Sequence, residues 1–110
     1  MNRDAVFEQL KIDEERVRAC FQRDLDTAIS ECEHLYGEGS FGEYPDEVQQ
    51  ILVNMMFNMG RPRLSKFKGM KAGVDARDWN RAADEMVDSS WYRQVTNRAD
   101  RLVARMRALA

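Results

Sequence analysis

The sequence predicts an all-α protein, a compact helical bundle in a single domain over residues 1–110. Apolar residues recur three and four positions apart along most of the chain, which is the periodicity of amphipathic helices. No stretch shows the alternation of a half-buried strand over a useful length. A chain of 110 residues with 44% hydrophobic and 33% charged residues is large enough for one core.

Two helices are predicted before a glycine-rich loop. The first is short and carries Val6, Phe7, Leu10, Ile12 and Asp13. The second ends near Tyr36, and its apolar positions are Val17, Phe21, Leu25, Ala28, Ile29 and Cys32. The stretch Gly37–Pro45 holds three of the six glycines and one of the two prolines, so it predicts a loop.

A long apolar helix is predicted after this loop, starting at Asp46. Its apolar positions are Val48, Ile51, Leu52, Met55, Met56 and Met59. Gly60 is the expected C-cap, and Pro62 is expected to prevent continuation. A short helix is then predicted from Leu64 to Lys71.

Two further helices complete the prediction. Asp75 is expected to cap a helix whose apolar face is Trp79, Ala82, Ala83, Met86 and Val87. Ser89 and Ser90 break the pattern. Thr96 or Asn97 is expected to cap the last helix, whose inward positions are Leu102, Val103, Met106 and Leu109. We expect both Trp79 and Trp91 to be largely buried, Trp91 against Phe57 or Met59.

Charge and cysteine content exclude several classes of protein. The net charge of −2 argues against non-specific binding to nucleic acid or to a membrane surface. The region from Asp24 to Glu47 is acidic and the C-terminal third is basic, which internal pairing explains. Charged residues soon follow Met1, so no secretory signal is expected. Cys20 and Cys32 lie about 18 Å apart on one predicted helix, so we expect reduced, buried thiols.

The chemistry of the side chains points to no cofactor and no metal. His34 is the only histidine, and a metal site needs three or four convergent ligands. Nothing indicates a nucleophilic triad or a phosphate-binding glycine loop. Carboxylates are plentiful and paired carboxylates perform acid–base chemistry, although charge runs are more often solvated helix faces.

One stretch, NMMFNMG from Asn54 to Gly60, combines core and polar features. Its methionines fit a buried helix face. Asn54 and Asn58 are four residues apart and lie on one helix edge, although asparagine is a poor helix former. The pair indicates an edge that lines a polar cleft or contacts a buried arginine, for which the candidates lie in SSWYRQVTNRADR, residues 89–101.

These motifs together resemble a known family. NMMFNMG, then WNRAADEM, then SSWYRQVTNRADRL are similar to the C-terminal helical lobe of phage lysozymes of the T-four type, glycoside hydrolase family 24. FQRDLDTAI, Phe21 to Ile29, resembles the family's connecting helix. The resemblance covers roughly residues 15–107, and VFEQLKIDE, Val6 to Glu14, is similar to the family's first helix.

The resemblance implies roles for individual residues. Glu14 takes the catalytic place, and its structural support is expected from Asp13, Arg98, Arg101 and Asn54. The substrate is expected to be peptidoglycan or another cell-wall saccharide, contacted by Phe57, Asn58 and Trp91. The family's β-rich lobe, which carries a second acid, is expected to be absent because Phe21 follows Glu14 so closely.

Two functions remain open at this point. The chain is either a lysozyme-like protein acting on peptidoglycan with impaired catalysis, or a non-catalytic binding or structural module, virion-associated or homo-oligomeric, on the same scaffold. A homodimer would restore a cleft from two chains. The expected location is the host cytoplasm, with release to the cell wall or incorporation into a virion as alternatives.

Overall fold

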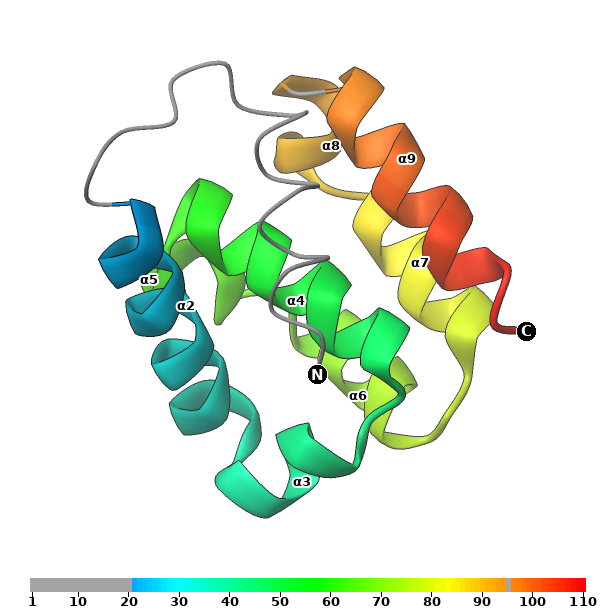
Figure 1. Ribbon diagram of the computed structural model, residues 1–110. Helices are drawn as coiled ribbons and strands as arrows, with labels where there is room; N and C mark the ends of the chain where they lie inside the picture. Colours follow the sequence, from blue (N-terminus) through cyan, green and yellow to red (C-terminus); the bar gives the residue numbers. More distant parts are fainter. Residues whose placement is uncertain (1–20, 95) are drawn as a thin grey trace. The chain divides into compact units, whose positions relative to one another are not determined.

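The computed structural model describes residues 21–94 and 96–110 (Figure 1). All regular structure in this part of the chain is helical, which confirms the all-α prediction. The predicted first helix and Cys20 lie outside the described residues. The chain divides after Ser65 into two compact units, and the single-domain arrangement stays a prediction.

The first unit contains four described helices. They are α2 (Phe21–Tyr36), α3 (Glu38–Glu43), α4 (Asp46–Met59) and α5 (Arg61–Leu64). The second unit contains α6 (Lys68–Asp75), α7 (Trp79–Val87), α8 (Ser90–Gln94) and α9 (Thr96–Arg107). The end of α2 and both ends of α4 match the prediction.

The predicted loop between α2 and α4 is wrong in part, because it contains helix α3. The rings of Tyr36, Phe41 and Tyr44 are buried, with centroids 6.1–6.4 Å apart, and they fix this segment against the end of α2. Buried Gln49 on α4 donates its side-chain N–H to the carbonyl of Tyr44 at 2.8 Å and to that of Gly42 at 3.3 Å. Ring packing and this amide together order a glycine-rich stretch that local sequence assigns to a loop.

The middle of helix α4 is buried on every side. The six predicted apolar positions are all buried, which confirms that face. Val53 and Asn54 are also buried, at 0% and 1% exposed, so residues 51–56 form an unbroken buried run. Burial on every side requires apolar side chains nearly all round, and Asn54 is the only polar residue of this run.

Helix α4 ends at Gly60 as predicted, but Pro62 does not keep the following residues from forming a helix. Gly60 adopts φ +80° and its N–H donates to the carbonyl of Met56 at 2.8 Å, as a glycine C-cap does. Pro62 does not prevent helix formation. It lies in the first turn of α5, where its missing N–H and fixed φ cost little.

The start of the second unit corrects two predicted positions. The helix expected from Leu64 to Lys71 begins only at Lys68, since Leu64 closes α5. Asp75 does not cap the following helix; it ends α6 and pairs with Lys71 at 2.9 Å. The cap is Asp78, whose carboxylate accepts the N–H of Arg81 at 3.1 Å.

Helix α7 packs closely on α6 and also contacts α9. A Cβ at Gly73 on α6 would lie 2.9 Å from the backbone nitrogen of Ala82, so only glycine permits this approach. The buried residues of the two faces include Met70, Val74, Ala82, Ala83 and Met86.

The C-terminal helices follow the prediction in part, because helix α8 was not expected. Ser89 begins the break, and its hydroxyl accepts the N–H of Tyr92 at 3.2 Å, which caps α8. The described part of helix α9 starts at Thr96 and buries Leu102, Val103 and Met106 as expected. The Thr96 hydroxyl donates to the carbonyls of Tyr92 at 3.1 Å and Arg93 at 3.4 Å, and the capping expected from Thr96 or Asn97 stays a prediction. Leu109 is only half-buried, because α9 ends at Arg107.

Candidate functional site

The candidate site in the first unit is built on α4. Asn54 is 1% exposed, Phe57 is half-buried, and Asn58 stands one helical turn beyond Asn54. The uninterrupted helix from Asp46 to Met59 therefore carries both asparagines along one edge, as their spacing predicts. An amide placed at so buried a position needs hydrogen-bond partners, which distinguishes Asn54 from its apolar neighbours.

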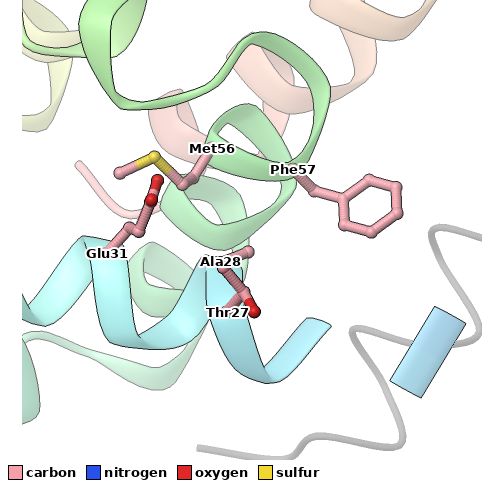
Figure 2. Close-up of a pocket in the computed structure, with 5 residues that line it drawn as sticks. All are labelled: Thr27, Ala28, Glu31, Met56 and Phe57. Atoms are coloured by element: carbon pink, nitrogen blue, oxygen red, sulfur yellow. The ribbon is translucent and has the colours of Figure 1, made fainter. Parts of the chain in front are cut away.

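A pocket of about 220 Å³ opens between α2 and α4 beside this edge (Figure 2). Thr27, Ala28 and Glu31 line it from α2, and Met56 and Phe57 line it from α4. Figure 2 shows Met56 turned toward Glu31, while the Phe57 ring projects away from that pair. Thr27 is exposed and Glu31 half-buried, so the pocket is accessible to solvent.

The lining sets what this pocket can bind. Ligand pockets usually measure about 300–1,000 Å³, so this one accommodates a single small ring rather than an extended ligand. A hydroxyl at Thr27 and a carboxylate at Glu31 can accept hydrogen bonds from ligand hydroxyls. Phe57 adds an apolar ring. A polyhydroxylated ring with one apolar face matches this combination.

Sequence reasoning identified only the α4 side of the pocket. Helix α2 was interpreted through its apolar face, so Thr27 and Glu31 received no role. Their spacing of four residues, flanking the small residue Ala28, is the signal that could have found them. The small side chain of Ala28, between the polar side chains of Thr27 and Glu31, leaves space for a pocket where a neighbouring helix packs.

Trp91 lies in α8 of the second unit and is 3% exposed, as predicted. Its ring packs edge-on against Phe67, with centroids 6.3 Å apart. Packing against Phe57 or Met59, and contact with substrate, stay predictions. Trp79 is less deeply buried than Trp91: it is half-buried at the start of α7, with the Arg77 guanidinium 5.9 Å from its ring centroid.

The proposed catalytic cluster is described only in part. Asp13 and Glu14 lie outside the described residues. Arg98 is half-buried and Arg101 exposed, three residues apart on one side of α9. Both arginines interact with other residues. The meeting of these four residues with Asn54 is not tested and stays a prediction.

Cys32 is fully buried and free, as predicted for this cysteine. Burial raises the pKa of its thiol far above the ordinary value, and the nearby carboxylates Glu31 and Glu33 act in the same direction. The thiol is therefore packed in the core and poorly reactive.

Neither metal ligands nor a membrane span is found in the described part of the chain. No group of three or more His, Cys, Asp or Glu side chains is placed there to hold a metal ion. None of the described helices combines the length and hydrophobicity that crossing a bilayer requires.

Comparison with known proteins supports the resemblance seen in the sequence. Probable T4-type lysozyme 1 of Dictyostelium discoideum is 29% identical over 87 residues, 78% of this chain and 51% of that protein. Probable T4-type lysozyme 2 of the same organism is 29% identical over 85 residues, 76% of this chain and 50% of that protein. No protein-family model matches the chain.

A phage protein is also similar. The pre-baseplate central spike protein Gp5 of Enterobacteria phage T4 is 41% identical over 54 residues, 49% of this chain and 9% of that protein. The chain spans about half the length of the two T4-type lysozymes it matches. These similarities support a relationship between this chain and lysozymes of the phage type.

Proposed function

We propose that this chain associates with peptidoglycan as a lysozyme-like protein, and that its 110 residues alone hydrolyse it poorly or not at all. The observation that carries the proposal is the similarity to two T4-type lysozymes over more than three quarters of the chain. The pocket beside Phe57 supports it, because its hydroxyl, carboxylate and aromatic ring suit a saccharide ring.

In this proposal Glu14 is the general acid, and Asp13, Arg98, Arg101 and Asn54 position it. Arginine offers five donors in a fixed fork, more than one carboxylate can fill. The Asn54 carbonyl would take a remaining donor without adding charge. Phe57, Asn58 and Trp91 would contact the saccharide.

A double-mutant cycle tests this arrangement. Glu14→Gln, Arg98→Gln and the double variant are compared by urea unfolding. Residues in direct contact should show a coupling of about 0.5–3 kcal/mol. Arg93→Gln, which changes an exposed arginine outside the cluster, is the matched control and should show no coupling to Glu14. If the losses of unfolding free energy for Glu14→Gln and Arg98→Gln are additive, the two residues do not share a site.

Impaired catalysis follows from the chemistry of glycoside hydrolysis. The reaction needs a proton donor on one side of the sugar bond and a carboxylate or an activated water on the other. Only six residues separate Glu14 from Phe21, which already lies in helix α2, so no lobe bearing a second acid fits between them. The donor side is thus the only catalytic element that the family resemblance assigns to this chain.

Clearing of chloroform-treated Gram-negative cells measures turnover. The chain and its Glu14→Gln variant should clear the suspension at equal, background rates. Clearing faster than Glu14→Gln would overturn the proposal of impaired catalysis. A rate that rises with the square of protein concentration would instead assign activity to a homodimer with a shared cleft.

The alternative function is a non-catalytic structural module of a virion. The similarity to the phage T4 spike protein over half of the chain favours it. Such a module would reach the cell wall with the particle, whereas a lysozyme-like protein made in the host cytoplasm would need a separate route. Immunodetection of the protein in purified virions would select the structural alternative, and detection in the lysate alone would exclude it.

A further inference from the structure

An acidic side chain, Glu31, lies at one end of the pocket between α2 and α4 (Figure 2). It is half-buried and lies beside the apolar side chains of Met56 and Phe57, which also line the pocket. Within residues 21–94 and 96–110, neither a hydrogen bond nor an ion pair to its carboxylate is found. Helix α4, which forms the opposite wall, has no lysine, arginine or histidine. A partly buried carboxylate with apolar neighbours favours a ligand that brings a positive charge.

The charges around Glu31 make this end of the pocket negative. Glu33 lies two residues further along α2, and helix α3 has no basic residue. Burial raises the pKa of the Cys32 thiol between them, and the charges of Glu31 and Glu33 raise it further. His34 is the basic residue nearest to Glu31 in the sequence, and its side chain is exposed to solvent. A cationic ligand is therefore attracted to this end of the pocket, and an anionic one is repelled.

The remaining lining residues suit a sugar ring better than a simple alkyl chain. Thr27 lies one turn before Glu31, about 6 Å along the helix axis, and its hydroxyl can exchange hydrogen bonds with a ring hydroxyl. Figure 2 shows Glu31 on one side of Ala28 and Phe57 on the other. A ring lying over Ala28 can therefore direct a charged substituent to Glu31 and an apolar face to Phe57. An alkyl chain would leave the Thr27 hydroxyl without a ligand partner.

We propose that this pocket selects an amino sugar whose amino group is free, with the ammonium paired to the Glu31 carboxylate. A ring hydroxyl bonds Thr27, and the apolar face of the ring packs against Phe57. N-acetylation converts the ammonium into a neutral amide, so an acetylated sugar loses the charge-assisted hydrogen bond. This selectivity rests on the proposed association with peptidoglycan, and it specifies which form of the wall's amino sugars the pocket prefers.

The test is isothermal titration calorimetry of the full chain at pH 6 with two tetrasaccharides, a glucosamine tetramer and its fully N-acetylated counterpart. The two ligands differ only in their acetyl groups. The glucosamine tetramer should bind on the order of tenfold more tightly, the low end for a hydrogen bond to a charged group, because Glu31 is only half-buried. Glu31→Gln keeps the size of the side chain but removes its charge, so it should abolish this preference.

The matched control is Glu33→Gln, which makes the same change of charge on the same helix but outside the pocket lining. It should keep the tenfold preference. Equal loss of preference in Glu31→Gln and Glu33→Gln would overturn the proposal, in favour of a general attraction of cations to this acidic helix. Displacement of the tetramer by n-butylammonium as readily as by glucosamine would also overturn it, in favour of any alkylammonium.

The unaltered chain separates this selectivity from the proposed function. Equal affinity for the two tetramers, or binding of neither, would overturn the amino-sugar site. Saturable binding to purified sacculi in the same preparation would then leave the association with peptidoglycan standing. A tenfold preference that depends on Glu31 would support the amino-sugar site even if sacculi are not bound, and in that case the association with peptidoglycan alone would fail.

Discussion

The two units of the chain differ in charge. Up to Ser65 there are thirteen acidic and seven basic residues, a net charge of −6. From Lys66 onward there are ten basic and six acidic residues, a net charge of +4. The sequence predicted this polarity along the chain, and the division into units coincides with it closely.

The units also differ in what holds them together. In the first, α4 supplies an unbroken buried run from Ile51 to Met56. In the second, amphipathic helices approach closely at Gly73 and Ala82 and carry charged outer faces. Exposed ion pairs such as Arg107 with Asp84, at 2.8 Å, add little stability there. Stability in the first unit thus rests on buried volume, and in the second on fit and capping.

The largest effects should come from removing buried side chains in each unit. Trp91→Ala should cost roughly 3–5 kcal/mol and Met55→Ala roughly 2–5 kcal/mol in urea melts, since both side chains are almost fully buried. Trp79→Ala is the control for a half-buried indole and should cost clearly less. A loss under about 1 kcal/mol for Trp91→Ala would contradict its place in the core.

Two glycine-to-alanine substitutions distinguish the effect of close helix packing on stability from the effect of helix propensity. Gly73→Ala in the second unit should cost about 1–3 kcal/mol, because its Cβ would meet the Ala82 backbone. Gly39→Ala in α3 meets nothing within 4 Å and should stabilise the protein by about 0.5–1 kcal/mol. Thermal melts measure both, and equal destabilisation would refute the contrast between the units.

Sequence periodicity predicted the parts of the fold that local physics determines. The face of α4, its glycine cap and the buried face of α9 all follow from spacing and capping rules. Helix α3 was missed because tertiary ring packing and Gln49 order a glycine-rich segment. Asp78 was missed because Asp75 is an equally good cap by local sequence. The backbone N–H groups of Arg77 and Asp78 donate to the carbonyls of Val74 and Gly73, so α6 ends here and the next helix starts after Asp78.

Only the residues that α4 contributes to the candidate site could be predicted from the sequence. Asn54 and Phe57 stood out within a methionine-rich helix, whereas Thr27 and Glu31 gained meaning only when α2 was seen beside α4. A pocket depends on the packing of two helices, and no single helix pattern contains that information. The roles of Asp13 and Glu14 came from family resemblance alone.

A smaller effect should distinguish the two candidate caps. Asp78→Ala should cost about 1 kcal/mol, because the Arg81 N–H loses its acceptor. Asp75→Ala removes only an exposed ion pair with Lys71 and should cost less than about 0.5 kcal/mol. Urea unfolding of the two variants decides the point. A larger loss of unfolding free energy for Asp75→Ala than for Asp78→Ala would show that Asp75 is the cap, as the sequence predicted.

The smallest effect concerns the thiol in the first unit. Cys32 should react with an aromatic disulfide reagent at pH 8 only as fast as the unit opens, because burial raises its pKa and blocks access. Measurements on a Cys20→Ser variant isolate its signal. Reaction at the rate of an exposed thiol would show that the core around α4 is open to solvent.

Association with peptidoglycan can be measured by cosedimentation of the protein with purified sacculi, as bound fraction against sacculus concentration. We expect saturable binding that Phe57→Ala weakens on the order of tenfold, as loss of an aromatic contact in a binding surface does. Leu109→Ala, a half-buried side chain in the other unit, should bind as the unaltered chain does. No sedimentation of the unaltered chain, or equal binding by Phe57→Ala, would contradict the proposed peptidoglycan-binding surface.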